Sequence, residues 1–439
     1  MSGDVNGNVT NVIGDQLHGL MERLFPICRS ITGEGVRETL RIIRDHVPIQ
    51  IVEVPTGIQV FDWTVPKEWN VRDAYVANLT GERVIDFKKN NLHLVGYSVP
   101  VKRRMSLTEL KQHLFTIPEH PDWIPYRTTY YKENWGFCLS HNQLSGLTDE
   151  QYDVCIDSTL KPGSMTYGEY YLEGETIDEV LLTCHVCHPS LCNDNLSGAT
   201  ILTFLAKHLC SAPRRYSYRF LFLPVTIGAI TWLCLNEGQV SKIRHGLVLT
   251  LLGDSGGFTY KKSRRGDCEV DRVAAHILKA RCAEHKILDF SPYGYDERQF
   301  CSPGFDLPVG CLMRTPYAEF AEYHTSADDL DFVTPENLSY SFSLTLALIE
   351  MLDQNRIFLN LFPKGEPQLG RRGLYQTGGS PLEKEQQMAF LWILNLSDGK
   401  HSLLDISEKS HLPFDLIVSA SRKLYESGLL SLQKSPSLG

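Results

Sequence analysis

The sequence predicts an α/β fold, a mixed and mostly parallel sheet with helices on both faces. Short apolar runs alternate along the chain with stretches of helical periodicity, and this alternation is typical of such a sheet. Isolated polar side chains follow several of the runs, as expected where strands of an open sheet end. The expected strands are residues 167–172, 179–183, 218–223, 246–252 and 308–312, and the expected helices between them are 197–209, 227–236 and 271–282.

Length and composition limit the class of protein. The chain has 439 residues and is 42% hydrophobic, enough for two or three domains with a sizeable core. Its net charge of -9 argues against general attraction to nucleic acid or to anionic membranes. No run of about 18 apolar residues occurs and the start lacks signal-peptide features, so we expect a cytoplasmic protein without a membrane partner. The twelve cysteines should then be largely reduced.

Changes in composition and in the length of the apolar runs suggest how the chain divides into domains. After about residue 62 the runs become short and are broken by Gly, Asn and Pro, which indicates a small β-rich insertion. A later stretch rich in Gly, Pro and Arg reads as a linker. The expected parts are 1–62, the first segment of the α/β domain; 63–127, the inserted domain; 128–362, the main α/β domain; 363–381, the linker; and 382–439, a winged-helix-like domain.

The last domain has the pattern of a winged helix, three short helices followed by a strand. The expected helices are 382–396, 404–410 and 413–427. A DNA reader should carry a basic recognition helix, but here Arg422 and Lys423 are balanced by Asp415 and Glu426. We therefore expect docking or homo-oligomerisation through this domain rather than DNA binding.

The segment 183–198 is the most informative stretch of the chain. It carries two histidines, three cysteines and Asp194 between an apolar run and a helical pattern, which is where ligands bind in open α/β sheets. Imidazole and carboxylate together suit zinc. A cysteine-rich loop with one buried, hydrogen-bonded histidine is the alternative, and taken alone the segment does not decide between them.

Polar groups follow strands at four places. The first is His188 with Asp194, the second is the turn 225–228, the third is Asp254, and the fourth is the segment 322–329. Each signal is weak because an Asp after a strand usually caps a helix or makes a turn. Together, and in this order, they are expected to converge on one crevice.

This order of residues resembles the zinc-dependent aminopeptidase family, which includes bacterial leucyl aminopeptidases and, as relatives, glutaminyl cyclases. Five phrases more closely resemble a bacterial aminopeptidase-like subgroup that has an inserted small domain and a C-terminal winged helix. The phrases span residues 28–33, 60–70, 187–198, 263–267 and 293–300, so the resemblance extends over nearly the whole chain.

The resemblance implies a metal site and a reaction. His188, Asp194 and Asp254 would hold a metal ion, and His324 would lie at a second metal position. Three protein ligands and an open position suit a hydrolytic zinc site, with one ion favoured over two. The implied activity is that of a metal-dependent aminopeptidase-like hydrolase acting on a small peptide or amide.

The chain departs from the family at the turn after the third strand. The aminopeptidases carry two adjacent glutamates there, the general base and a metal ligand, but this chain has Val225 and Thr226. Valine cannot move a proton. Either another carboxylate replaces the base, or the site is repurposed for other acyl or aminoacyl chemistry in a biosynthetic pathway, or for binding only. The candidate replacement carboxylates are Glu322, Asp296 and Glu297.

Three further residues are candidates for substrate binding. Arg264 and Arg265 could clamp a carboxylate or phosphate, because a guanidinium offers a bidentate fork. A solvated basic loop explains them equally well. Tyr293, in the matching phrase 293–300, is placed with them. His185 and Cys187 flank His188, and we expect one of them to support a metal ligand and at least one to be packed in the core.

Overall fold

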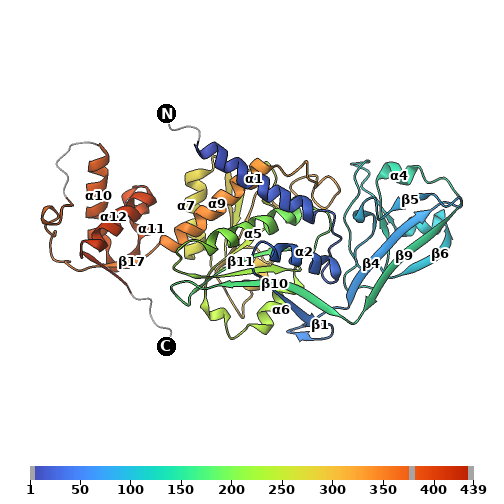
Figure 1. Ribbon diagram of the computed structural model, residues 1–439, viewed down its shortest axis with the longest axis horizontal. Coiled ribbons are helices and arrows are strands. Elements are labelled where there is room, and N and C mark those ends of the chain that lie inside the picture. The colour runs from blue at the N-terminus through green and yellow to red at the C-terminus, as the bar shows by residue number, and fades with distance from the viewer. Residues whose placement is uncertain (1–4, 375–380, 434–439) are drawn as a thin grey trace. The chain divides into compact units, whose positions relative to one another are not determined.

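The computed structural model describes residues 5–374 and 381–433 (Figure 1). It divides into two units, Met1–Leu346 and Ala347–Gly439. The described residues contain no helix that is both long and apolar enough to cross a membrane.

The first unit contains the predicted mixed sheet, which has eight strands. β11 lies near its centre and pairs in parallel with β12 on one side and β13 on the other. All seven residues of β11 are buried, and residues 180–182 at its centre are apolar, as expected for a strand covered on both faces. In spatial order the strands are β1 (Gln50–Pro55), β10 (Ser164–Leu172), β12 (Ser217–Leu223), β11 (Glu179–His185), β13 (Ile243–Leu249), β16 (Val309–Met313), β14 (Phe258–Lys261) and β15 (His285–Leu288).

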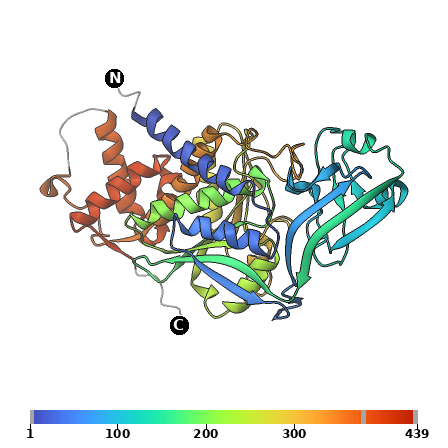
Figure 2. The same cartoon turned by 45° about the vertical axis from the view of Figure 1, so that its right-hand side comes forward.

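Helices cover both faces of this sheet. α2 and α5 lie on one face and α6 on the other (Figures 1 and 2). α2 buries Val36, Thr39, Leu40 and Ile43, which recur at helical spacing and so form one stripe towards the sheet. The helices of this unit are α1 (Val5–Leu24), α2 (Glu34–Arg44), α5 (Ser197–Cys210), α6 (Ile227–Leu235), α7 (Glu269–Arg281), α8 (Glu297–Phe300) and α9 (Pro335–Gln354), which continues into the second unit.

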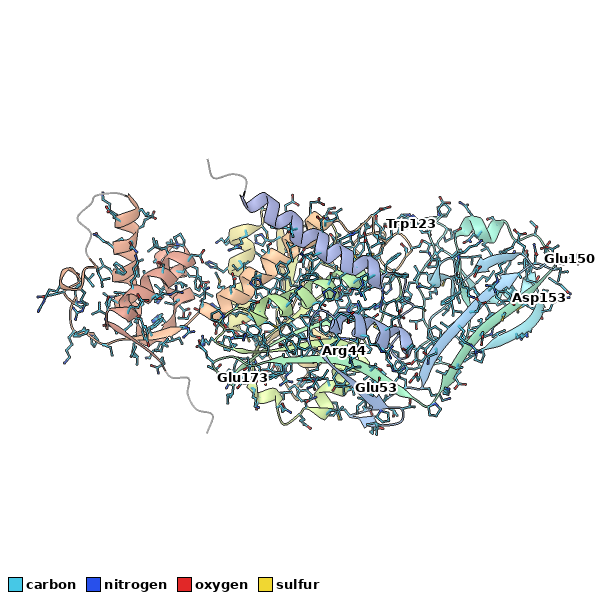
Figure 3. All side chains as sticks on the ribbon, in the orientation of Figure 1. Arg44, Glu53, Trp123, Glu150, Asp153 and Glu173 are labelled. Carbon is cyan, nitrogen blue, oxygen red and sulfur yellow. The ribbon has the colours of Figure 1, made fainter. Side chains whose placement is uncertain are left out.

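The inserted domain is built on a four-stranded antiparallel sheet of order β5-β4-β9-β6. The expected end of this domain at residue 127 is too early, because β9 pairs along its length with β4 and β6. Glu150, just before β9, and Asp153, near its start, lie at the outer end of this sheet (Figure 3). The bounds are β4 (Glu68–Ala77), β5 (Arg83–Asp86), β6 (Val101–Ser106), α3 (Leu107–Leu110), α4 (His141–Ser145) and β9 (Gln151–Lys161), with short strand pairs β2 (Gln59–Val60) with β3 (Trp63–Thr64) and β7 (Leu114–Phe115) with β8 (Phe137–Cys138).

The second unit is a winged helix. Its three-stranded sheet has the order β18-β17-β19, and because the central strand β17 precedes residue 382, the domain starts earlier than expected. Residues 375–380 of the expected linker 363–381 lie outside the described part of the chain. The elements are β17 (Ile357–Asn360), α10 (Pro381–Leu396), β18 (Asp398–Ser402), α11 (Leu403–Ser410), α12 (Phe414–Glu426) and β19 (Leu430–Leu432).

A buried ion triad joins three neighbouring strands of the main sheet. Arg219 on β12, only 7% exposed, pairs with Glu179 on β11 through two hydrogen bonds of 2.7 and 3.0 Å. Its remaining amino group contacts Glu169 on β10. A buried charge is costly unless it is paired, so each member of the triad depends on the others.

Arg219→Met is expected to lower the free energy of unfolding by about 3–5 kcal/mol, because Glu179 would remain buried without its partner. Arg72→Met is the matched control, since Arg72 pairs with Asp157 on the surface and exposed pairs stabilise little. Urea unfolding followed by circular dichroism measures both. Equal losses for the two variants would contradict the assignment of the triad as a buried structural element.

Candidate metal centre

The candidate site lies at the carboxyl end of β11. His185 is the last residue of that strand and His188 follows in the loop, both buried. The chain then passes through an irregular segment, Cys192–Leu196, whose Asp194 and Asn195 have non-helical backbone angles, before α5 begins at Ser197. Such an interruption is tolerated where side chains and neighbouring strands supply the hydrogen bonds that a regular helix would make.

Three histidines surround the fully buried carboxylate of Asp194. His185 Nε2 donates to Asp194 Oδ1 and His324 Nε2 donates to Asp194 Oδ2, each at 2.9 Å. The rings of His185 and His188 lie 4.8 Å apart, and those of His188 and His324 lie 5.3 Å apart. His324 has 34% of its side chain exposed, so it forms the more open side of the cluster.

Burial, charges and hydrogen bonds within the cluster set the protonation states of Asp194 and His188. Burial alone would raise the pKa of Asp194, but His188 nearby and the hydrogen bonds from His185 and His324 hold it well below its ordinary value. Burial also lowers the pKa of His188 well below its ordinary value. Asp194 is therefore a carboxylate and His188 a neutral imidazole at neutral pH, the protonation states that metal ligands need.

Asp328 and Asp254 hold the segment that carries Asp194. The Asp328 carboxylate accepts hydrogen bonds from the backbone N–H groups of Asn193 at 2.5 Å and Asp194 at 3.0 Å. Asp254 accepts from the side chain of Asn193 at 3.0 Å and from the Thr315 hydroxyl at 2.7 Å. Asp254 therefore supports the loop and does not join the histidine cluster, contrary to its expected place beside His188.

Asn195 fixes the orientation of His185. Its Oδ1 accepts from the backbone N–H groups of Gly198 and Leu251, so its Nδ2 must face His185 Nδ1, which lies 3.3 Å away. Asn195 Nδ2 also donates to the carbonyl of Leu249 at 3.0 Å, so Asn195 ties the His185 ring to the end of β13, with His185 Nε2 towards Asp194. The close packing of the turn also explains Gly198, where a Cβ atom would lie 2.4 Å from the carbonyl oxygen of Leu249.

The inserted domain holds the loop of His324 in place. The backbone N–H of Tyr126 donates to the carbonyl of His324 at 2.7 Å, and Ser326 exchanges two hydrogen bonds with Ile124. His324 has a φ of 56°, in the left-handed region that non-glycine residues rarely adopt. The neighbouring hydrogen bonds hold this conformation.

The donor set fits a zinc ion. Ligand atoms of His185, His188 and Asp194 lie within 4.8 Å of one another, so one ion could contact all three, and His324 reaches the second oxygen of Asp194. Two imidazoles and a carboxylate are typical zinc ligands. The sequence analysis placed His188, Asp194 and His324 at one site, but it left open whether His185 supports a metal ligand or packs in the core. The position of His185 at the end of a buried strand was the feature that pointed to a role in the site.

The turn at Val225 lies directly beside this cluster. The backbone N–H of Val225 donates to Cys187 Sγ at 3.3 Å, and Cys187 Sγ lies 3.8 Å from His188 Nδ1. Burial raises the pKa of the Cys187 thiol, and the carboxylates of Asp296 and Asp194 raise it further. The Val225 side chain is only partly buried.

The three candidate replacement carboxylates differ in environment. Asp296 is buried, its Oδ1 has no hydrogen-bond partner among the described residues, and burial together with Glu297 raises its pKa to about 8. Glu297 is buried in an ion pair with Lys261 at 2.8 Å. Glu322 is half-buried, two residues before His324.

The three residues predicted to bind substrate lie in two different surroundings. Arg264 and Arg265 both pair with Asp306, at 2.9 and 3.0 Å. Their guanidinium groups therefore have a structural partner already. Tyr293 is 67% exposed, and its ring lies 5.7 Å from that of Tyr317.

Comparison with known proteins gives a family for both units. A family model described as "Domain of unknown function (DUF4910)" matches residues 18–355, and one described as "winged helix-turn-helix" matches residues 356–432. A protein of Clostridium acetobutylicum named "Putative polysaccharide biosynthesis protein with aminopeptidase-like domain" is 54% identical over 420 residues, which cover 95% of this chain and 96% of that protein.

Solved structures give the same result. The crystal structure of a "putative peptidase" from Clostridium acetobutylicum matches with a TM-score of 0.92 at 52% identity and covers 98% of this chain and 99% of that one. The zinc aminopeptidase BSAP of Bacillus subtilis matches with a TM-score of 0.55 at 12% identity, over 77% of this chain and 95% of that one. A Peptidase M28 precursor from Shewanella amazonensis SB2B matches with a TM-score of 0.53 at 12% identity, over 79% and 97%. The distant matches confirm the aminopeptidase-like fold, and by the family model and its Clostridium relative the chain belongs to the DUF4910 family, with a C-terminal winged helix.

Proposed function

We propose that this protein is a zinc-dependent, aminopeptidase-like hydrolase that acts on a small peptide or amide substrate. The observation that carries the proposal is the cluster of His185, His188 and His324 around Asp194 at the carboxyl end of β11. The aminopeptidase-like fold supports it, because zinc aminopeptidases share this architecture.

The proposed zinc site uses His188, Asp194 and one or both of His185 and His324, with one ion favoured over two. Bound zinc would lower the pKa of a water molecule and polarise the scissile carbonyl group. Asp254 is left out of the ligand set because its oxygens accept hydrogen bonds from Asn193 and Thr315.

The proton transfers require a carboxylate that Val225 cannot supply. We assign this role to Asp296, which raises the pKa of the Cys187 thiol beside the Val225 turn and whose Oδ1 has no partner among the described residues. Glu297 is a weaker candidate because Lys261 already neutralises it. Glu322, two residues before His324, remains the alternative.

A second function is favoured by Val225 itself. A member of this fold without its general base could carry out other acyl or aminoacyl chemistry in a biosynthetic pathway, or only bind its ligand. The relative whose name refers to polysaccharide biosynthesis supports a biosynthetic setting.

For the winged helix we propose a docking role, including contact with a second copy of the chain. On α12 the positive charges of the exposed Arg422 and Lys423 are balanced by the negative charges of the exposed Asp415 and Glu426. A balanced face of this kind lacks the positive field that binding to DNA phosphates requires.

The purified full chain is expected to bind one zinc ion, and His188→Ala is expected to weaken zinc binding by more than about tenfold, since even the loss of a group that supports a ligand costs about 10- to 100-fold. Equilibrium dialysis with elemental analysis measures both. His285→Ala, which removes an exposed histidine on β15, is the control. Absence of zinc from the chelator-treated and reloaded protein would contradict the proposal.

If neither Asp296 nor Glu322 serves as the base, Val225→Glu is expected to raise hydrolysis of an aminoacyl anilide by about 100- to 10,000-fold in the presence of zinc, the usual contribution of a positioned general base. Val225→Gln is the matched control, because it has a similar size but no base. If Val225→Glu is folded, binds zinc and still hydrolyses no more anilide than Val225→Gln, the site is not a peptidase that lacks only its base, and the second function is the better one.

If Asp296 is the base in the natural protein, hydrolysis rises with pH through about 8, because the charged form of Asp296 accepts the proton and its pKa is raised to about 8. Asp296→Asn is expected to remove both the rise and most of the activity. Rate profiles between pH 6 and 9 test this, with Glu322→Gln measured alongside. A profile that Asp296→Asn leaves unchanged but Glu322→Gln abolishes would transfer the role to Glu322.

A further inference from the structure

His188 is held differently from the other two histidines of the cluster. Nε2 of His185 and Nε2 of His324 each bond to an oxygen of Asp194 at 2.9 Å. Among the described residues, the His188 ring makes a single hydrogen-bond contact, with the sulfur of Cys187 at 3.8 Å. A thiol is a weak hydrogen-bond partner. The direction of the His188 ring therefore depends mainly on how its backbone is held.

That backbone belongs to a loop without regular secondary structure, residues 186–191. Two side-chain hydrogen bonds fix the middle of the loop to the segment that follows α1. Arg29 Nε donates to the carbonyl of His188 at 2.8 Å, and Ser190 Oγ donates to the carbonyl of Phe25 at 2.7 Å. The end of α1 thus supports the loop that presents His188.

Arg29 is a buried cation that the rest of the fold does not pair with an acid. It is 2% exposed, and among the described residues its hydrogen bonds go to two backbone carbonyl groups and to no carboxylate. The second of these carbonyls belongs to Leu24, the last residue of α1, where a helix carries partial negative charge. Burial lowers the pKa of Arg29 to about 10, so the guanidinium stays charged at neutral pH. A buried charge costs stability, and what this one links to α1 is His188.

The segment that carries this guanidinium is fixed in turn to the inserted domain. Thr32 Oγ1 accepts a hydrogen bond from the backbone N–H of Trp69 at 3.0 Å. Gly33 has a φ of 99°, and a Cβ atom there would lie 2.0 Å from the carbonyl oxygen of Trp69. The sequence phrases 28–33 and 60–70 therefore meet at this contact, although neither contains a proposed metal ligand.

We infer that Arg29 is a positioning residue for the metal site, because it fixes the His188 loop to the end of α1 so that the His188 ring faces Asp194. This inference rests on the proposed zinc site and adds a residue that would not itself touch the ion. The sign of its effect is diagnostic. If Arg29 acted on a bound cation only through its charge, removing it would tighten binding, since like charges repel. If it acts by holding the loop, removing it weakens binding.

Arg29→Met is expected to weaken zinc binding by about 10- to 100-fold, the usual effect of losing a group that supports a metal ligand. Arg29→Lys keeps a charged donor, so its affinity is expected to lie between those of Arg29→Met and the unchanged chain. Arg219→Met is the matched control, because Arg219 is also buried but pairs with Glu179 at the opposite end of β11 from His185. Equilibrium dialysis with elemental analysis measures affinity, and the visible spectrum of the cobalt(II)-loaded full chain reports changes in ligand geometry.

Hydrogen exchange of the metal-free full chain gives a second measure. The backbone N–H groups of Val186 and Cys192, at the two ends of the loop, donate to carbonyl groups at 2.9 and 3.0 Å. Arg29→Met is expected to remove the protection of amides in 186–192 while the remaining sheet stays protected, because the loop would open locally. Arg219→Met is expected to leave the protection of 186–192 in place.

The outcomes separate this inference from the proposed function. Zinc binding that Arg29→Met leaves unchanged, tightens, or weakens no more than Arg219→Met does would overturn the inference. If the unchanged chain takes up no zinc, the proposed hydrolase fails, and exchange in 186–192 then decides for or against the role of Arg29. Circular dichroism shows whether each variant is folded. If Arg29→Met is not folded, Arg29→Lys is compared with the unchanged chain, and equal zinc affinity together with equal exchange would overturn the inference.

Discussion

The Asp328 carboxylate, which accepts hydrogen bonds from the N–H groups of Asn193 and Asp194, is the interaction on which the rest of the site depends. It allows an irregular segment to stand between β11 and α5 without buried, unpaired N–H groups. Asp194 can then turn its side chain to the histidines, while Asn195 anchors the segment to the last residue of β13 and Asn193 anchors it to Gly253. The geometry of the proposed metal site is thus set by hydrogen bonds to residues that would not themselves bind the ion, as in many metal sites.

Much of this architecture could be predicted because the relevant signals are local. The apolar residues 180–182 of β11, the polar loop after that strand and the periodic α5 follow one another closely in the sequence. β9 shows the alternation of a half-buried strand at Tyr152, Val154 and Ile156, and it escaped prediction only because the insertion was expected to end sooner. β15 has no such pattern, since three of its four residues are exposed, and only pairing with β14 defines it.

The candidate site was predicted less well than the fold, and Asp254 shows why. It follows an apolar run, as a ligand would, but β13 ends at Leu249 and the chain continues through four more residues before Asp254. That extra length carries the carboxylate to Asn193 and Thr315. His185 lies two residues beyond the expected end of its strand, where sequence alone left it between supporting a ligand and packing in the core, yet its Nε2 donates to Asp194. Side-chain direction at a strand end depends on tertiary partners that spacing does not encode.

The sequence separation of the Asp328 contacts, 134 and 135 residues, has a consequence for biogenesis. At roughly 5–20 residues per second, the ribosome needs on the order of ten seconds to proceed from Asn193 to Asp328. During that interval the segment has neither its carboxylate clamp nor His324, while the thiols of Cys184, Cys187 and Cys192 have not yet been enclosed by the later strands. Thiolates are strong ligands for soft metal ions. The proposed metal site can therefore form only after His324 and Asp328 have been synthesised, and in the finished fold the three sulfur atoms are buried.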